Sequence, residues 1–471
     1  MKRILLFFVV ASSWFAAVPG KAQTAAPAQT VKAPDERVKA DILVVVAHPD
    51  DEAAVTPYLA RAIYDEHKRV AVVFATRGGS GGNDYRREHG KALADIREQE
   101  ARQACAALGI TDVWFLDGKD TASQNVLNSL ANWGHGANLE ALVRIVRLTR
   151  PEVVITWLPG VFIGENHGDH QAAGVLATEA FDLANDSTAF PAQVAGASKR
   201  LEQYLENLTP WQPRKLYFFS DAEDQKQFAG TGPAYSVRDI SPSQKKPYWR
   251  LALDAAKPHL TQFPEDVQRL SQMSEEELNK MMSDPKAGWW PEPMTLIFGK
   301  GVVAMKATDD VFASFNASGP DKNAFAEPHG PARRQQPRFA LGGPWYYYSA
   351  FREKHGLDEL RAAQTPEIGI KAGSTVLIPL VIAQTNGQAV EAKVELNVPA
   401  GWKVIHGEGT FRLPEEDRTD LLVEVLTPEL GKEELKKVGT QEVIVRGSLK
   451  GQPIGEVRLK VLLKASALAQ Q

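Results

Sequence analysis

An alternation of short apolar runs with amphipathic segments, beginning near residue 41, constrains the fold most strongly. The runs at residues 42–47, 70–76 and 153–157 are almost entirely apolar, so both faces of each predicted strand are expected to be buried. The segments between them have helical periodicity, and several end at glycine or proline. Strands that alternate with helices in this way predict an α/β fold with a mainly parallel sheet and helices on both faces.

The first 22 residues have the layout of a secretory signal peptide. A basic start at residues 2–3 precedes an apolar run over residues 4–18, and cleavage is expected near Ala22. The run is shorter than the roughly 20 residues that a membrane-spanning helix needs. We therefore expect a secreted or periplasmic protein without a transmembrane segment. Cleavage would remove three basic residues and take the net charge from −4 to about −7, which argues against a nucleic-acid partner.

The 471 residues are too many for one typical domain, and the composition changes along the chain. A linker at residues 23–37 precedes the α/β core at residues 38–220. Residues 221–365 are less regular and rich in aromatic residues, and we interpret them as an extension packed on the core. These aromatics could line a sugar-binding cleft or simply fill a core. Short strand-like runs at residues 366–466, several of them separated by turn residues, are typical of an Ig-like β-sandwich.

An acidic cluster follows the first predicted strand directly. Residues 47–52 read AHPDDE, so one histidine and three carboxylates lie where sites form in open α/β sheets. Adjacent carboxylates repel one another unless a cation or a helix N-terminus neutralises them. His48 and Asp51 are three residues apart across a tight turn, so both could reach one metal ion. Taken alone, this pair fits a polar turn that caps the next helix at least as well.

A second polar cluster follows the predicted strand at residues 153–157. Residues 166–170 read NHGDH and open a helix. His170, together with His48 and Asp51, would supply two imidazoles and one carboxylate, which leaves a fourth position for water as in catalytic zinc sites. Zinc lowers the pKa of such a water and polarises a carbonyl group. The two clusters together predict a hydrolytic Zn²⁺ site at one edge of the sheet.

Both motifs resemble the signatures of the PIG-L/LmbE-type zinc-dependent deacetylases, which read AHPDDE and, later in the chain, HxDH. The intervening residues 97–100 read REQE, similar to the Arg-x-x-Glu of that family, and the resemblance extends from about residue 41 to residue 220. It implies a Rossmann-like core. It also implies hydrolysis of an N-acetyl or other N-acyl group on an amino sugar or glycoconjugate, which would be the partner of this site.

The resemblance assigns metal and acid–base roles to four residues of this chain. His48, Asp51 and His170 would be the ligands of Zn²⁺. Asp50 would be the general base that takes a proton from water and later returns it to the leaving amine. These roles agree with the chemistry of the site, because amide hydrolysis with an activated water needs a base beside that water.

Five further residues receive less specific roles from the same resemblance. His167 would stabilise the oxyanion as an imidazolium whose pKa is tuned by Asp169, and both are grouped with Asp50 as catalytic residues. Arg97 and Glu100 would either support the site through an ion pair or pair on their own helix. Asp120 is a candidate for contact with substrate hydroxyl groups.

Three other functions are compatible with parts of the sequence. An amidase acting on a non-sugar amide or a thiol conjugate would use the same site, but a signal peptide fits it less well. A non-catalytic carbohydrate-binding protein would have no need of an intact set of ligands and base. A dinucleotide-binding enzyme would need Gly-x-Gly-x-x-Gly after the first strand, which is absent, and the glycine-rich loop at residues 76–82 lacks the Lys-Ser/Thr of a phosphate-binding loop.

Overall fold

The computed structural model describes most of the chain beyond residue 33. The described residues are 34–123, 125–160, 167–195, 205–220, 231–284, 289–303, 305–315, 337–357, 360, 366–384, 388–415 and 418–464. The expected signal peptide and most of the linker lie outside them. Within these ranges, no helix combines the length and the apolar character that crossing a membrane requires.

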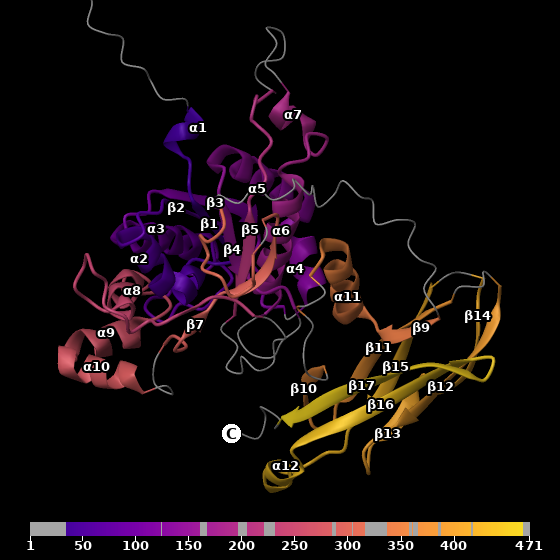
Figure 1. Ribbon diagram of the computed structural model, residues 1–471. Helices are drawn as coiled ribbons and strands as arrows, with labels where there is room; N and C mark the ends of the chain where they lie inside the picture. The colour runs from indigo at the N-terminus through magenta and orange to yellow at the C-terminus, as the bar shows by residue number, and fades with distance from the viewer. Residues whose placement is uncertain are drawn as a thin grey trace, which may run out of the picture.

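A six-stranded sheet forms the centre of the N-terminal half (Figure 1). Its order is β3 (Asp112–Gly118), β2 (Val70–Thr76), β1 (Ile42–Val46), β4 (Val153–Trp157), β5 (Lys215–Phe219) and β8 (Ile297–Gly301). The first five of these strands are parallel and β8 is antiparallel to β5. Every residue of β1, β2, β4 and β5 is buried, as expected for apolar strands covered on both faces. The mainly parallel sheet predicted from the sequence is confirmed.

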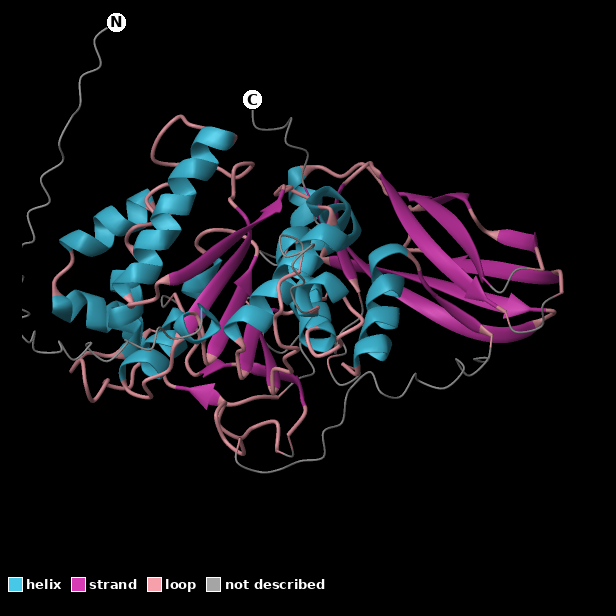
Figure 2. Ribbon diagram, turned by 90° about the horizontal axis from the view of Figure 1, so that it is seen from above, coloured by secondary structure: helices cyan, strands magenta, loops and turns pink. Residues whose placement is uncertain are grey.

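Helices cover this sheet on both sides (Figures 1 and 2). On one side lie α2 (Thr56–Tyr64) and α3 (Lys91–Ala107), with α8 (Tyr248–Ala256) packed against both. On the other side α6 (Gly168–Leu183) contacts α4 (Val126–Trp133) and α5 (His135–Thr149). Two four-residue helices, α1 (Pro34–Arg37) and α7 (Pro191–Val194), lie at the periphery.

The strand order creates an opening at the carboxyl ends of β1 and β4. From β1 the chain proceeds outward through β2 to β3, whereas β4 lies on the opposite side of β1, so the connecting helices leave in opposite directions. Ligands bind at such switch points in open α/β sheets. The AHPDDE motif follows β1 and runs into a 3-10 helix, η1 (Asp51–Val55). The second motif begins α6, which comes after β4. The fold therefore brings both predicted motifs to one place.

The aromatic-rich span 221–365 contributes to two parts of the molecule. Packed on the core are β8 and α8, together with α9 (Pro264–Gln272), α10 (Glu275–Ser283) and the short pair β6 (Ala234–Tyr235) and β7 (Met294–Thr295). Strand β9 (Arg338–Leu341) lies in the same span but pairs with β11 of the C-terminal region instead. The extension thus does not pack wholly on the core.

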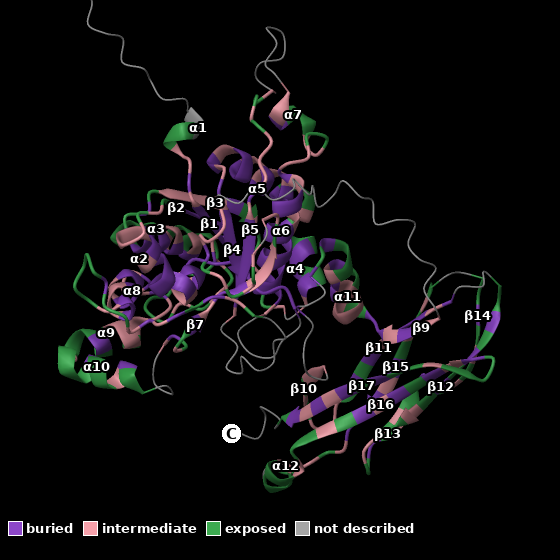
Figure 3. Ribbon diagram, viewed as in Figure 1, coloured by how far each residue is buried: buried purple, intermediate pink, exposed green. Residues whose placement is uncertain are grey.

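The C-terminal region is rich in strands, as predicted, and forms two sheets. One sheet has the order β10 (Glu367–Lys371), β17 (Gln452–Lys464), β16 (Thr440–Leu449), β12 (Val390–Asn397) and β14 (Gly409–Leu413). The other has the order β13 (Lys403–His406), β15 (Arg418–Leu426), β11 (Thr375–Ala383) and β9, and the short helix α12 (Lys432–Val438) precedes β16. Buried and exposed residues alternate along β12 and β16 (Figure 3), and buried side chains of both sheets form one apolar cluster.

Helix α11 (Gly343–His355) connects the two halves. It follows β9 directly and packs against α6. The Tyr348 hydroxyl donates to Gln171 Oε1 at 2.9 Å, and His355 Nδ1 lies 2.6 Å from Asp182 Oδ2. Lys300 also contacts Asp182. These contacts hold α11 near both ends of α6.

Candidate metal centre and active site

Three N–H groups orient the carboxylate of Asp51 towards two histidines. Its Oδ2 accepts hydrogen bonds from the backbone N–H of Ala47 at 2.9 Å and of His48 at 3.0 Å, and from the Trp157 indole at 2.8 Å. Its Oδ1 lies 3.1 Å from His170 Nε2 and 3.6 Å from His48 Nδ1. Burial would raise the pKa of Asp51, but the two imidazoles hold it well below its usual value, so this carboxylate is ionised.

The spacing of these donor atoms fits a tetrahedral cation site. Zinc–nitrogen and zinc–oxygen bonds of about 2.0–2.1 Å place neighbouring ligand atoms about 3.3 Å apart in a tetrahedron. The two distances from Asp51 Oδ1, 3.1 and 3.6 Å, lie on either side of that value. His48 directs its other nitrogen, Nε2, to Asp169 Oδ2 at 3.3 Å, the kind of contact that fixes a metal-ligating imidazole. The predicted ligands His48, Asp51 and His170 are therefore brought together.

His167 lies beside these ligands. Its ring centroid is 5.1 Å from that of His48 and 4.2 Å from that of His170. One nitrogen of each of the three rings lies within 4.8 Å of the others, so these histidines form a cluster that could hold a metal ion. His48 and His170 are buried, and His167 is half-buried.

The surroundings of His167 oppose a positive charge on its ring. Its Nδ1 accepts the backbone N–H of Asp169 at 3.3 Å, which caps α6. Burial and the neighbouring His170 and His48 rings lower the pKa of His167 to about 4, so the imidazolium expected from the sequence is not favoured. The Asp169 carboxylate contacts His48 instead and accepts the Thr121 N–H at 2.7 Å. With Nδ1 accepting the Asp169 N–H, a neutral His167 would carry its proton on Nε2 and could donate a hydrogen bond from there.

Asp50 is held by an arginine from α3. Its Oδ1 lies 3.0 Å from an Arg97 terminal nitrogen, which also donates to the Pro49 carbonyl at 2.6 Å. The other terminal nitrogen of Arg97 donates to the Gly78 carbonyl at 3.0 Å. Burial raises the pKa of Asp50, and the Arg97 charge opposes that increase. The backbone of Asp50 has φ = 110°, a strained conformation for a residue with a Cβ.

The three remaining predicted residues have other partners. Arg97 and Glu100 do not pair with each other: Arg97 contacts Asp50, whereas both carboxylate oxygens of Glu100 bind Thr261. Asp120 accepts the backbone N–H of Ser80 at 2.8 Å and, through its carbonyl, the Ser80 hydroxyl at 3.0 Å. Arg97 therefore supports the site directly, and Asp120 anchors the glycine-rich loop.

The glycines of this loop are explained by the position of Arg97. A Cβ atom on Gly78 would lie 2.5 Å from an Arg97 terminal nitrogen, and one on Gly81 would lie 2.7 Å from it. Gly78 also has φ = 67°, which favours glycine. The loop packs its backbone against the guanidinium, so its composition reflects close packing rather than binding of phosphate.

Gly78→Ala is expected to destabilise the fold more than Gly134→Ala. Both glycines have positive φ, 67° and 65°, so both variants lose about 1–2 kcal/mol from the backbone conformation. Only Gly78 would also overlap a buried side chain, because nothing lies within 4 Å of a Cβ on Gly134. That overlap should add about 1–3 kcal/mol. Urea unfolding of both variants measures the difference, and equal losses would contradict the packing explanation.

Sequence reasoning missed several residues of the site. The Trp157 ring stacks on His170 with centroids 4.1 Å apart and planes at 4°, while its N–H binds Asp51. His259 Nε2 lies 2.6 Å from Glu52 Oε1. Trp157 could have been suspected from its place at the end of a predicted strand, whereas no local pattern marks His259.

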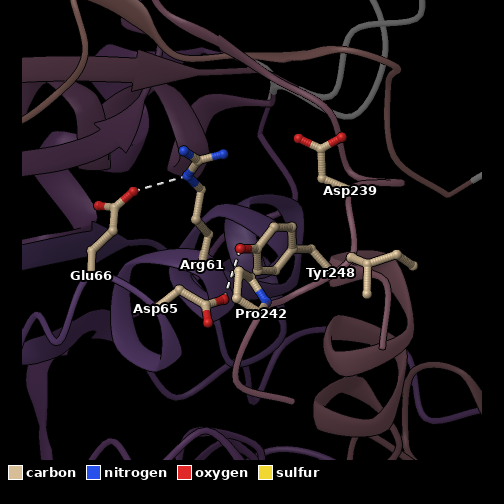
Figure 4. Close-up of a pocket in the computed structure, with 7 residues that line it drawn as sticks. Arg61, Asp65, Glu66, Asp239, Pro242 and Tyr248 are labelled. Atoms are coloured by element: carbon tan, nitrogen blue, oxygen red, sulfur yellow. Dashed lines mark hydrogen bonds and ion pairs between the residues drawn. The ribbon is translucent and has the colours of Figure 1, made fainter. Parts of the chain in front are cut away.

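A separate surface hollow lies at the far end of α2 (Figure 4). Its charged side chains include Arg61, paired with Glu66 at 2.9 Å, and Asp65, which accepts the Tyr248 hydroxyl at 2.7 Å. None of its lining residues belongs to the predicted site. This hollow therefore does not compete with the histidine cluster as a reaction centre.

Comparisons with known proteins identify a family and relatives of this chain. The family model for GlcNAc-PI de-N-acetylase (PIG-L) matches residues 43–181. The chain is 36% identical over 188 residues to the 1D-myo-inositol 2-acetamido-2-deoxy-alpha-D-glucopyranoside deacetylase 1 of Frankia alni, covering 36% of this chain and 59% of that protein. It is 33% identical over 228 residues to deacetylase 2 of the same description from Frankia casuarinae, covering 44% of this chain and 70% of that protein.

Among solved structures, the N,N'-diacetylchitobiose deacetylase from Pyrococcus horikoshii matches 62% of this chain and 90% of its own, with 20% identity and a TM-score of 0.38. The family model matches the part of the chain that contains both motifs, after β1 and after β4. This chain belongs to the PIG-L family.

Proposed function

We propose that the protein is a zinc-dependent hydrolase that removes an N-acetyl or other N-acyl group from an amino sugar or glycoconjugate. The observation that carries the proposal is the convergence of His48, Asp51 and His170 at the switch point of the sheet, with Asp50 adjacent. The cluster of His48, His167 and His170 could bind a divalent metal. Asp51 Oδ1 lies beside His170 Nε2 and His48 Nδ1, and two nitrogens with one carboxylate oxygen would suit zinc. When bound, zinc lowers the pKa of water and polarises the acyl carbonyl.

In this proposal, Asp50 moves the proton. Its carboxylate accepts a proton from the attacking water as the water oxygen forms a bond to the acyl carbon. Asp50 then delivers that proton to the nitrogen as the carbon–nitrogen bond breaks, which releases the amine and the carboxylic acid, and the acid ionises in water. Arg97 keeps Asp50 oriented through the 3.0 Å ion pair. Burial raises the pKa of Asp50, which makes the carboxylate a stronger base than an exposed aspartate.

His167 is the residue we propose to face the developing negative charge. With Nδ1 engaged by the Asp169 N–H, its proton lies on Nε2 and can be donated to the acyl oxygen. A neutral donor serves this purpose, since oxyanion stabilisation requires a positioned hydrogen bond and not a full charge. Asp169 contributes by fixing His48, and its backbone N–H is the group of α6 that the His167 side chain caps.

The relatives favour an amino-sugar substrate over the other amides considered. The two Frankia enzymes are named for a 2-acetamido-2-deoxy-glucopyranoside and the Pyrococcus enzyme for N,N'-diacetylchitobiose, and all three names describe deacetylases. We therefore propose a 2-acetamido sugar as the substrate class. The basic and apolar residues at 2–18 support secretion or a periplasmic location as part of the same proposal.

We further propose that residues 38–220 are the catalytic core and that the C-terminal strands form an Ig-like β-sandwich. The two C-terminal sheets share one apolar cluster, which supports a sandwich arrangement. Helix α11 joins this region to α6.

A substrate panel tests the proposed activity. Purified protein with its zinc content measured would be incubated with N-acetylglucosamine, N,N'-diacetylchitobiose, an inositol-linked N-acetylglucosamine and a non-sugar N-acetyl amine. We expect zinc close to one per chain and acetate release from at least one sugar. Acetate released only from the non-sugar amine would support the amidase alternative. No release from a zinc-loaded protein on any substrate would contradict the proposal.

A further inference from the structure

A short segment of the extension lies against the acidic turn of the candidate site. It runs over residues 258–262, between α8 and α9. His259 in this segment is fully buried, and its Nε2 lies 2.6 Å from Glu52 Oε1. Its Nδ1 has no hydrogen-bond partner among the described residues, so the ring is oriented by its single hydrogen bond, from Nε2 to Glu52. A histidine 207 positions away thus fixes the last residue of the AHPDDE motif.

Glu52 in turn binds the backbone of Asp50. While Oε1 binds His259, Oε2 accepts the backbone N–H of Asp50 at 3.0 Å. Asp50 has φ = 110°, and such a conformation persists only where surrounding contacts hold it. Glu52 supplies one of these contacts, and it is itself a buried carboxylate that needs a donor. His259 is the side chain that meets this need from outside the motif.

The same segment reaches Asp50 by a second route. Thr261 donates its N–H and its hydroxyl to Glu100 at 3.0 and 2.6 Å. Glu100 lies one turn from Arg97 on α3, and Arg97 binds the Asp50 carboxylate. Thr261 also accepts the N–H of Asp84 through its carbonyl at 3.0 Å. Residues 259–261 therefore hold the backbone of Asp50 through Glu52, and through Glu100 they anchor the helix whose Arg97 binds the Asp50 carboxylate.

We infer that His259 is a positioning residue for the reaction, which sets the turn carrying Asp50 and Asp51 through Glu52. The inference rests on the proposed function for its catalytic readout, but it concerns a residue outside residues 43–181, where the family model matches. His259 touches none of the proposed ligands in the hydrogen bonds and ion pairs of the described residues. Its effect should therefore fall on kcat and on the geometry of the metal site, and not on KM.

Two substitutions that differ by one methylene group test this role. The amide nitrogen of Gln can take the position of Nε2 and donate to Glu52, whereas that of Asn takes the position of Nδ1 and cannot reach it. His259→Asn is expected to lower kcat by about 10–100-fold with little change in KM, and His259→Gln to remain within a few-fold of wild type. The visible absorption of the cobalt(II)-loaded proteins provides a readout that needs no substrate, and it should change in His259→Asn only.

His355 provides the matched control. It is also buried and also lies 2.6 Å from a buried carboxylate, Asp182 Oδ2, but through Nδ1 and at the far end of α6. Here His355→Asn should retain the contact and His355→Gln should lose it, and Tm should fall only in the second. Neither should alter kcat or the cobalt spectrum. This pair separates general destabilisation from an effect on the site.

The outcomes are distinct for each hypothesis. Wild-type protein without deacetylase activity would contradict the proposed function, and the cobalt spectra would still decide the role of His259. Equal kcat values and equal spectra for His259→Asn and wild type would overturn the inference. Loss of activity in both His259 variants, with a fall in Tm like that of His355→Gln, would assign His259 to folding alone.

Discussion

Asp50→Asn is expected to lower kcat for N-acetyl hydrolysis by about 10²–10⁴-fold, the contribution typical of general acid–base catalysis. The amide keeps the size of the side chain and can still accept a hydrogen bond from Arg97, but it cannot take a proton from water. Because Asp50 is not one of the proposed ligands, the variant should retain its metal. Acetate release at saturating substrate gives kcat, and atomic absorption gives the metal content.

Asp95→Asn is the control for this substitution. Asp95 is an exposed residue of α3 whose carboxylate pairs with Lys91, so the same chemical change should leave kcat unaltered. A kcat for Asp50→Asn within a few-fold of wild type would remove Asp50 as the base. Loss of metal from Asp50→Asn would instead identify the carboxylate as a ligand.

His170→Ala is expected to abolish both metal binding and activity. The substitution removes one of three proposed donors and uncovers the Trp157 ring that stacks on it. With two donors left, His48 and Asp51, the site can no longer close around a cation with a single position open for water. Metal content after dialysis should fall to background, and added zinc should not restore acetate release.

His167→Ala distinguishes the two possible sets of ligands. In the arrangement proposed here His167 is a hydrogen-bond donor, so the variant should retain its metal and lose about 10²–10³-fold in kcat. If the three histidines were the ligands, His167→Ala would lose its metal as well. A variant of Asp51 that kept a full complement of zinc would support that second arrangement.

The core of the fold is predictable because its strands are unambiguous. Strands β1, β2 and β4 are almost entirely apolar runs buried on both faces, and their predicted bounds differ from the observed ones by at most one residue. Helix α4 had no such signal, because its eight residues provide only about two turns of periodicity. Strand β9 was not predicted either. It has only four residues in an irregular span, and its partner β11 lies more than 30 residues later in the chain.

The meeting of the three proposed ligands was predictable, and their surroundings were not. His48, Asp51 and His170 follow two strands, and parallel strands bring their carboxyl ends to one edge of the sheet. The tautomer of a neutral His167 depends on which group its Nδ1 meets, and the sequence does not reveal that the partner is the backbone N–H of Asp169. One sequence feature could have suggested this contact: His167 directly precedes a predicted helix, and the unpaired N–H groups of a first helical turn need acceptors.

Partners that are distant in the chain were the least accessible to sequence reasoning. Arg97 and Glu100 have the spacing of a helix pair, yet Arg97 turns to Asp50 and Glu100 turns to Thr261. Buried carboxylates require donors, and both donors come from segments whose place beside the site depends on tertiary packing. His259 lies in a stretch without regular periodicity, so only the structure reveals its contact with Glu52.

The attachment of α11 to α6 has a consequence for how the protein melts. Tyr348 binds Gln171, the residue after His170, and α11 follows β9 of a C-terminal sheet. A cation bound at the start of α6 stabilises the folded state by mass action. Because α11 connects that helix to the C-terminal strands, the two parts are expected to unfold as one cooperative unit. Loading the metal site should then raise the melting temperature of the distant sheets together with that of the catalytic half.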